Sequence, residues 1–357
     1  MADVQTQIVQ FDEKIRLSWN NEEKTLREKR KIILERLRAQ FDAMREAGAK
    51  IPSFSDFNQG SYKMDTGIHP AKGDYDIDVG LQFNCARSEY PNPVTLKGLV
   101  ADALEGHTHL GTEIKLSCVT VKYMVDGVQA YHVDLAIYTY EDPRSATKRL
   151  FLAKGKRGSG EDDRWWEESD PQGLINWVEG RFQDPDQEKQ FLRVIRCLKR
   201  WKSEKFKTDG NNAPSGIGLT VAAGQWFRPQ VYRDAFAATT TFDDLKAMKA
   251  LVDVMISRFV QIGWKQEDGS ALYRLSVPVP VAPGTDIFER MTDGQMTTFR
   301  KHLLQLQDRL DEVTNEPDPV RACQLMRKDF GDDFPIPEKN VTGQIGGRAI
   351  ASRGVSA

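Results

Sequence analysis

Hydrophobic positions in the N-terminal part of the chain change from a helical period to a strand period. Residues 20–47 carry apolar side chains at helical spacing, namely Leu26, Ile33, Leu37, Phe41 and Met44. Gly48 follows them and is a residue type that commonly ends helices. Residues 74–83 instead alternate apolar side chains with acidic or polar ones, as does a strand with one buried face. We therefore predict a long amphipathic helix followed by a β-strand.

Two further alternating runs, at 113–125 and 128–140, are separated by Asp126-Gly127, a dipeptide suited to a tight hairpin turn. We expect these two runs to pair as antiparallel strands. After the loop-rich stretch 141–170, apolar positions recur at helical spacing in six segments: 171–183, 185–207, 216–227, 242–262, 294–312 and 317–330. The pattern predicts a sheet-containing first half and a helical second half.

These changes of pattern suggest the domain boundaries. We expect an N-terminal scaffold helix within 1–50 that packs on both lobes, a sheet-containing core at 51–170 and a helical lobe at 171–337. Residues 338–357 offer little to bury and contain several glycines, so we expect a flexible tail there. The predicted fold class is α/β (α+β), with two lobes and a mixed, largely antiparallel sheet in the first.

Composition agrees with a globular protein of this kind. The 357 residues are 39% hydrophobic and 29% charged, and the formal net charge is -2, which provides no bulk attraction to nucleic acid.

The sequence lacks an apolar run of transmembrane length, and its first ten residues lack the basic and apolar regions of a signal peptide. We expect a cytoplasmic protein without a membrane partner. The four cysteines are scattered singly, which argues against a disulfide framework or a zinc site.

Three aspartates on the predicted strands are candidates for metal chemistry. Asp76 and Asp78 lie two residues apart, so their carboxylates project from the same face of a strand, about 7 Å apart along the backbone. Asp134 interrupts an apolar strand whose neighbouring residues Val133 and Leu135 face the other way. Three such carboxylates can hold two Mg²⁺ ions, which stabilise the attacking and leaving oxygens of a phosphoryl displacement. Taken singly, each aspartate is better explained by a solvated strand face or a turn.

The order of motifs makes the aspartates more informative. Gly60-Ser61 precedes the acidic strand, where glycine lets the backbone approach a phosphate and serine can donate a hydrogen bond to it. Alone, a Gly-Ser pair is only a turn. The sequence of Gly60-Ser61, Asp76-Ile77-Asp78 and then Asp134 resembles the active-site signature of the polymerase-beta-like nucleotidyltransferases.

The resemblance extends over nearly the whole chain to the cGAS/DncV-like nucleotidyltransferases (CD-NTases) of bacterial anti-phage (CBASS) systems. It is carried by NQGSYKMDTGIHP, RWWEESDPQGLINWV, VIRCLKRWKSEKF, NNAPSGIGLTVAA, PGTDIFERM and KDFGDDFPIP. The resemblance implies a bilobed polymerase-beta-like core and a long N-terminal bridging helix. It also implies that Lys199 and Ser215 bind the donor triphosphate together with Gly60 and Ser61. From the residues alone, Lys199 is better explained as a solvated helix lysine, and an N-cap is an alternative role for Ser215.

What such an enzyme does is also implied by the resemblance. It would condense ribonucleoside triphosphates, with ATP and GTP expected, into a cyclic di- or trinucleotide second messenger and release pyrophosphate. Its cofactor would be two Mg²⁺ ions at Asp76, Asp78 and Asp134, with Mn²⁺ as a substitute. Its partners would be a downstream effector and an accessory protein acting on the C-terminal tail, and no DNA activator is expected.

Two other functions remain open from the sequence. One is a nucleotidyltransferase that acts on RNA or protein, and the other is a catalytically inactive nucleotide-binding scaffold. The stretch 144–157 contains six lysines and arginines that could line a phosphate or polymer groove. Because a charge run in a loop is usually solvated, we interpret this stretch as a solvent-exposed loop.

Overall fold

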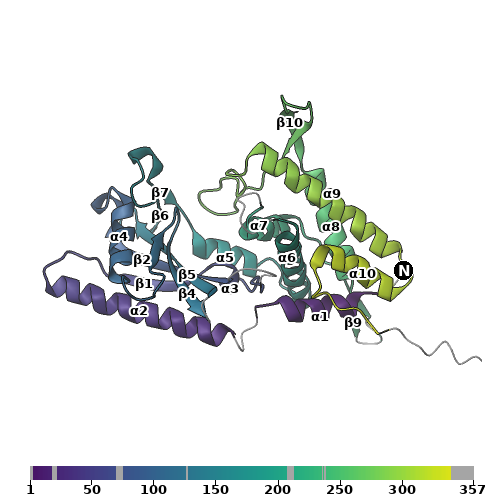
Figure 1. Ribbon diagram of the computed structural model, residues 1–357, viewed down its shortest axis with the longest axis horizontal. Coiled ribbons are helices and arrows are strands. Elements are labelled where there is room, and N and C mark those ends of the chain that lie inside the picture. Colours follow the sequence, from purple (N-terminus) through teal and green to yellow (C-terminus); the bar gives the residue numbers. More distant parts are fainter. Residues whose placement is uncertain are drawn as a thin grey trace, which may run out of the picture.

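The structure is a computed structural model that describes residues 3–17, 22–69, 75–125, 128–206, 213–234, 236 and 239–338. Within these, the side chains of residues 22–26, 75, 76, 125 and 128–130 are outside the description. Two lobes lie side by side, a sheet lobe on the left of Figure 1 and a helical lobe on the right. The predicted hairpin turn Asp126-Gly127 and the tail from residue 339 onward fall outside the described residues.

The sheet lobe is built on one mixed sheet. Its strands run in the order β1 (Phe54–Asn58), β2 (Tyr75–Ala86), β5 (Val128–Tyr140), β4 (Val119–Val125) and β3 (Thr112–Ile114). β6 (Leu150–Lys154) pairs with the end of β5, and β7 (Trp165–Glu168) pairs with β6. Among the described strands only β2 and β5 pair in parallel, so the sheet is largely antiparallel, as predicted.

One face of this sheet is covered by α2 (Glu22–Glu46) and α4 (Pro93–Ala103), which lie beside it in Figure 1. The helical positions Ile33, Leu37 and Phe41 of α2 are fully buried, as their spacing predicted. The alternating positions of β2, among them Val79 and Phe83, are fully buried on the same side. The opposite face of β2, which carries the aspartates, is therefore turned away from this core.

The helical lobe contains most of the helices in the described chain. They are α5 (Pro171–Glu179), α6 (Pro185–Lys205), α7 (Gly216–Trp226), α8 (Asp244–Ser257), α9 (Asp293–Asn315) and α10 (Pro319–Phe330). Three of them begin with a capping aspartate followed by proline, a combination that fixes a helix start. α6 runs through the centre of the lobe, where Phe191 and Trp201 are fully buried.

The predicted helix 242–262 is too long at its end. α8 stops at Ser257, and the following residues form β10 (Val260–Trp264), which pairs with β11 (Ala271–Arg274). The apolar residues of β10 that fitted a helical period are exposed, so no packing favours a continued helix. A second small hairpin joins β8 (Val231–Asp234) and β9 (Thr239–Phe242).

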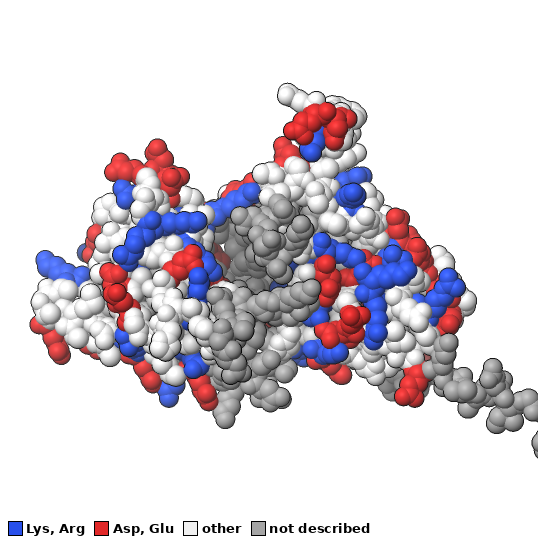
Figure 2. All heavy atoms as spheres, in the orientation of Figure 1, with Lys and Arg blue, Asp and Glu red and all other residues white. Residues whose placement is uncertain are grey.

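The N-terminal segment contacts the lobes through two separate helices. α1 (Gln5–Ile15), which the sequence did not reveal, buries Ile8, Phe11 and Ile15 in the core of the helical lobe. α2 packs on the sheet lobe, and the short α3 (Gly60–Lys63) follows β1. Among the described residues no helix is long and apolar enough to cross a bilayer. Figure 2 shows acidic and basic side chains interspersed over the described part of the visible face.

Candidate active site

A cleft of about 780 Å³ lies between the two lobes. Five of the predicted site residues line it: Gly60, Ser61 and Asp78 from the sheet lobe, and Lys199 and Ser215 from the helical lobe. Asp134 is not among the lining residues, and the side chain of Asp76 is outside the description. The structure thus brings the predicted phosphate-binding residues of both lobes to one cavity.

The register of the two parallel strands places the aspartates together. Asp78 of β2 is paired with Asp134 of β5, and Asp76 is paired with His132. Neighbouring strands lie about 4.8 Å apart, so paired residues present their side chains next to each other on one face. The carboxylate of Asp134 accepts a hydrogen bond from the Thr120 hydroxyl.

Two cationic or titratable side chains also approach Asp134. Lys115 Nζ lies 3.8 Å from one carboxylate oxygen, and His132 Nε2 lies 3.7 Å from the other. These contacts keep a mostly buried carboxylate compensated without enclosing it in a single tight ion pair.

Gly60 and Ser61 form the first residues of α3, directly against Asp78. Gly60 has φ +70°, and a Cβ added there would lie 1.9 Å from Asp78 Oδ2. The amide of Gln59 donates to the Asp78 carbonyl over 3.3 Å. Only glycine allows this close approach of turn and carboxylate, because any side chain would displace the carboxylate.

On the helical side, Lys199 lies beside the start of α7, since a Cβ added at Gly216 would be 3.6 Å from Lys199 Cε. Lys199 Nζ donates to Thr66 O at 3.0 Å and Thr66 Oγ1 at 2.8 Å. The Ser215 hydroxyl caps α7 by accepting from the Gly218 amide at 3.0 Å. The N-cap interpretation of Ser215 is therefore confirmed, and its contact with phosphate stays a prediction. The amides at the start of α7 and the Lys199 ammonium together suit an anionic ligand.

Lys154 was assigned to a solvated charge run, and that interpretation is wrong for this residue. It ends β6, is only 6% exposed and lines the cleft. Its ammonium pairs with Glu167 at 2.8 Å and donates to the Ser117 hydroxyl at 3.0 Å. Burial lowers the pKa of Lys154, and the carboxylate of Glu167 opposes that shift. The apolar run Leu150–Ala153 that precedes it was the available sign of a buried strand.

Two further cleft residues were not singled out from the sequence. The Tyr138 hydroxyl donates to Gln59 Oε1 at 2.9 Å, and burial raises the pKa of this phenol so that it remains protonated. Arg290 of the helical lobe lies 3.7 Å from Glu167 of the sheet lobe. The Arg290 contact links the two walls of the cleft.

The carboxylates can be tested for their fit to a metal. Among the described side chains, which exclude that of Asp76, no group of three or more metal-ligating residues is assembled. Asp78 and Asp134 nevertheless supply oxygen donors at paired strand positions, and Asp76 occupies the matching position two residues earlier on β2. An all-oxygen carboxylate set is what Mg²⁺ prefers, so the residues present fit this ion.

Comparisons with known proteins agree with this geometry. Residues 54–138 match the family model described as cyclic GMP-AMP synthase DncV-like, nucleotidyltransferase domain. A curated relative, the cyclic GMP-AMP synthase of Escherichia albertii, is 27% identical over 184 residues, which are 49% of this chain and 38% of that protein. The match therefore spans well under half of the relative's own length.

Solved structures of Vibrio cholerae DncV resemble the chain over most of its length. The DncV cyclic AMP-GMP synthase matches with a TM-score of 0.66 at 18% identity, over 92% of this chain and 96% of that chain. The GTP-bound form matches with a TM-score of 0.67 over 90% and 92%. This likeness confirms the predicted bilobed polymerase-beta-like fold. The segment 54–138 that the DncV-like nucleotidyltransferase model matches carries Gly60, Ser61, Asp78 and Asp134.

Proposed function

We propose that the protein is a magnesium-dependent nucleotidyltransferase that condenses ribonucleoside triphosphates into a cyclic di- or trinucleotide and releases pyrophosphate. The observation that carries the proposal is the pairing of Asp78 with Asp134 beside a cleft whose wall includes the Gly60-Ser61 turn. The matched relative is a cyclic GMP-AMP synthase, and one similar DncV structure contains the linear intermediate 5' pppA(3',5')pG. Both support a cyclic product.

The proposed roles follow from the strand positions of the three aspartates. Asp76, Asp78 and Asp134 would hold two Mg²⁺ ions, which would neutralise charge on the reacting phosphate and its leaving group. Asp134, compensated by Thr120 and Lys115, would favour deprotonation of the acceptor hydroxyl. That hydroxyl attacks the α-phosphate of the donor, and the bond to pyrophosphate breaks.

Donor binding uses groups from both lobes. The Gly60-Ser61 turn approaches the triphosphate from the sheet lobe, while Lys199 and the N-terminus of α7 at Ser215 approach it from the helical lobe. Backbone amides, a helix N-terminus and an ammonium group are the usual ligands of a polyphosphate. Because these groups position the donor, catalysis by this chain consists mainly of alignment and charge neutralisation.

ATP and GTP are the proposed substrates. DncV structures were solved with GTP and with ATP and GTP together, which supports purine nucleotides for this chain. The proposal also includes cytoplasmic anti-phage signalling through a downstream effector, and an accessory protein that acts on the tail. The resemblance over nearly the whole chain supports this role, although the tail itself lies outside the described residues.

A nucleotide incorporation assay tests the proposal. Purified protein is incubated with labelled ATP, GTP, CTP and UTP, singly and mixed, with Mg²⁺ or Mn²⁺, and the products are treated with phosphatase. The expected result is a phosphatase-resistant product that Asp78→Asn abolishes. A label transferred only to added RNA or to protein would favour the alternative acceptors. Wild-type protein that forms no product with either metal would favour the inactive scaffold.

A further inference from the structure

Three cations on one face of α6 bind a single short segment, residues 65–69, which follows α3. Residues 196, 199 and 200 are spaced so that their side chains project from the same side of the helix. Each donates to a main-chain carbonyl: Arg196 to Asp65 at 2.6 Å, Lys199 to Thr66 at 3.0 Å and Arg200 to His69 at 2.9 Å. All three side chains are almost completely buried. The carbonyls of residues 65, 66 and 69 are therefore fixed to α6.

This segment continues directly from the phosphate-binding turn. The Thr66 amide donates to the Ser61 carbonyl at 2.9 Å, so the two residues move together. On its other side the segment is held by the end of α1, where Leu17 N donates to Gly67 O at 3.1 Å and His69 N donates to Ile15 O at 2.8 Å. Segment 65–69 thus lies between α1 and α6.

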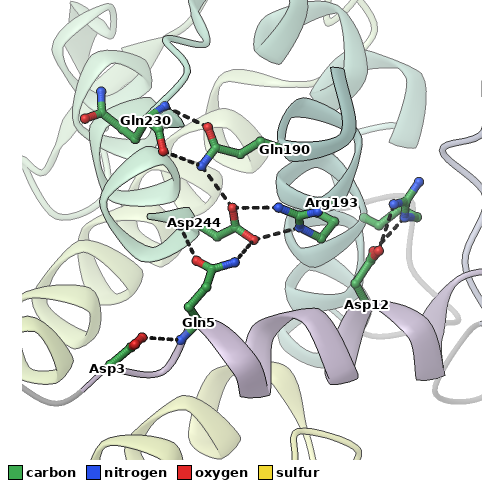
Figure 3. A network of polar contacts seen from close by, with 8 residues as sticks. Asp3, Gln5, Asp12, Gln190, Arg193, Gln230 and Asp244 are labelled. Carbon is green, nitrogen blue, oxygen red and sulfur yellow. Dashed lines mark hydrogen bonds and ion pairs between the residues drawn. The ribbon is translucent and has the colours of Figure 1, made fainter. Parts of the chain in front are cut away.

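A buried ion pair links α1 to the first of the three cations. Arg196 Nε and Nη2 donate to the two carboxylate oxygens of Asp12 at 2.6 and 2.8 Å. Figure 3 shows Asp12 projecting from α1. Only Nη1 is left for the Asp65 carbonyl. The carboxylate of Asp65 is 3.5 Å from the same Nη1 and is itself held by Arg16 at 2.7 Å.

Loss of the Asp12 charge would leave the buried guanidinium without its main counterion. The nearest remaining carboxylate is that of Asp65, and a shift toward it would pull the backbone that Lys199 and Ser61 also contact. Neither Asp12 nor Arg196 lines the cleft, so both act through other residues.

We infer that Asp12 is a positioning residue for donor binding: through Arg196 it fixes segment 65–69 and so sets the spacing between Ser61 and Lys199. The inference rests on the proposed function, because it assigns those two residues to the donor triphosphate. The first helix of the chain, remote from the cleft, thereby determines how well the two lobes hold one nucleotide.

The chain contains a matched control. Arg193, one turn earlier on α6, donates to the carboxylate of Asp244 at 2.7 and 3.1 Å, and Asp244 is fully buried. Gln5 of α1 and Gln190 also donate to Asp244, as Figure 3 shows. The Arg193–Asp244 pair is a buried arginine–aspartate pair like Arg196–Asp12, and it is also connected to α1, through Gln5. None of these hydrogen bonds reaches segment 65–69.

The test compares Asp12→Asn with Asp244→Asn in the full chain. Both should lower the Tm, because each leaves a buried guanidinium poorly paired. Well below both Tm values, Asp12→Asn should raise the Kd for a nonhydrolysable ATP analogue with Mg²⁺, and the KM for ATP, about tenfold, while Asp244→Asn changes them less than twofold. Arg196→Lys, which can keep the ion pair but not the bridge to Asp65 O, should raise the same Kd and KM.

The outcomes separate a failure of the Asp12 inference from a failure of the proposed function. Equal effects of Asp12→Asn and Asp244→Asn on Kd and KM would overturn the inference and leave the proposed function intact. If Asp12→Asn does not fold, Arg196→Lys decides alone, and a wild-type Kd and KM in that variant would overturn the inference. Wild-type protein that binds no nucleotide would overturn the proposed function, and the inference with it.

Discussion

Asp78 on β2 and Asp134 on β5 are directly paired across two parallel strands, and the residues that flank them are buried in the core. The two carboxylates share one face of the sheet, and like charges placed opposite each other destabilise a strand pair. A bound cation would remove that repulsion. The pairing therefore links metal binding to the stability of the sheet as well as to catalysis.

The first prediction concerns the variant Asp78→Asn. Product formation should fall about a hundredfold or more, since one charged ligand of the reacting phosphate's cations is lost. Without metal, the Tm should stay the same or rise, because the repulsion with Asp134 is relieved. Mg²⁺ should raise the Tm of the wild type but not that of the variant, as measured by thermal unfolding with and without the ion.

Glu113→Gln is the control for this experiment. Glu113 lies on β3 of the same sheet and pairs with Lys122 at 2.6 Å. Its variant should keep both activity and the Mg²⁺-dependent rise in Tm. An unchanged Mg²⁺ response in Asp78→Asn would show that Asp78 does not hold the ion.

The local pattern of the sequence predicted the strands better than their partners. The alternation around Asp78 and Asp134 fixes which side of each strand is apolar, because successive side chains always point to opposite faces. The parallel pairing of β2 with β5 and its register depend on residues about 55 positions apart, so no short segment contains them. The sequence placed both aspartates on strand faces, and only the fold placed them opposite each other.

There are physical reasons why the sequence pattern did not predict α1 or the burial of Lys154. The N-cap residue of α1 is Val4, which has no side chain that can cap a helix, so the usual residue type at a helix start is absent. Its apolar residues are buried by α6 and α8, which follow far later in the chain. Lys154 was taken for a loop residue because its burial comes from Glu167 on the next strand rather than from its neighbours in sequence.

Gly60→Ala should damage the site through sterics alone. Its backbone lies in the left-handed region, which costs a residue with a side chain about 1–2 kcal/mol, and its new Cβ would overlap the carboxylate of Asp78. We expect a lower Tm and loss of product formation. Gly98→Ala is the control, since Gly98 lies within α4 with nothing within 4 Å of its Cβ position, and it should raise stability by about 0.5–1 kcal/mol. Full activity in Gly60→Ala would contradict the close approach of the Gly60 backbone to the Asp78 carboxylate.

The third prediction is a pH dependence caused by Lys97. This fully buried lysine of α4 donates to the carbonyls of Lys115, Leu116 and Gly155, which adjoin the cleft residues Ser117 and Lys154 in the sequence. Burial lowers the pKa of Lys97 from 10.5 to about 8, with a smaller lowering by the charge of Lys154, and Cys118 opposes the shift.

The sign follows from proton binding in the two states. Between pH 8 and 10.5 the unfolded chain holds the Lys97 proton and the folded chain releases it, so this group makes the free energy of unfolding rise with pH. Relative to Lys97→Met, the wild type should gain stability over that range at up to about 1.4 kcal/mol per pH unit. Below pH 8 the difference should be flat. Denaturant unfolding at a series of pH values measures the free energy of unfolding of both proteins. If the two free energies changed with pH in the same way, the lowered pKa would not belong to Lys97.

The fourth prediction separates the two roles of Ser215. Ser215→Ala removes the cap of α7 and should lower the free energy of unfolding by about 1 kcal/mol, whether or not Ser215 binds a ligand. This variant therefore does not distinguish a helix cap from a phosphate-binding residue. Ser215→Asp keeps an acceptor for the Gly218 amide and adds a charge that suits a helix N-terminus, so the Tm should be unchanged or higher. The same charge would repel a triphosphate beside Lys199, and the Kd for ATP with Mg²⁺ should rise at least about tenfold.

Thr292→Asp controls for the added charge in the Ser215 experiment, because Thr292 caps α9 in the same way and does not line the cleft. Its Kd for ATP should match that of the wild type. If Ser215→Asp also bound ATP with wild-type affinity, the Ser215 hydroxyl would serve only as a helix cap. The triphosphate would then have to be held from the helical lobe by Lys199 and other cleft residues, without the N-terminus of α7.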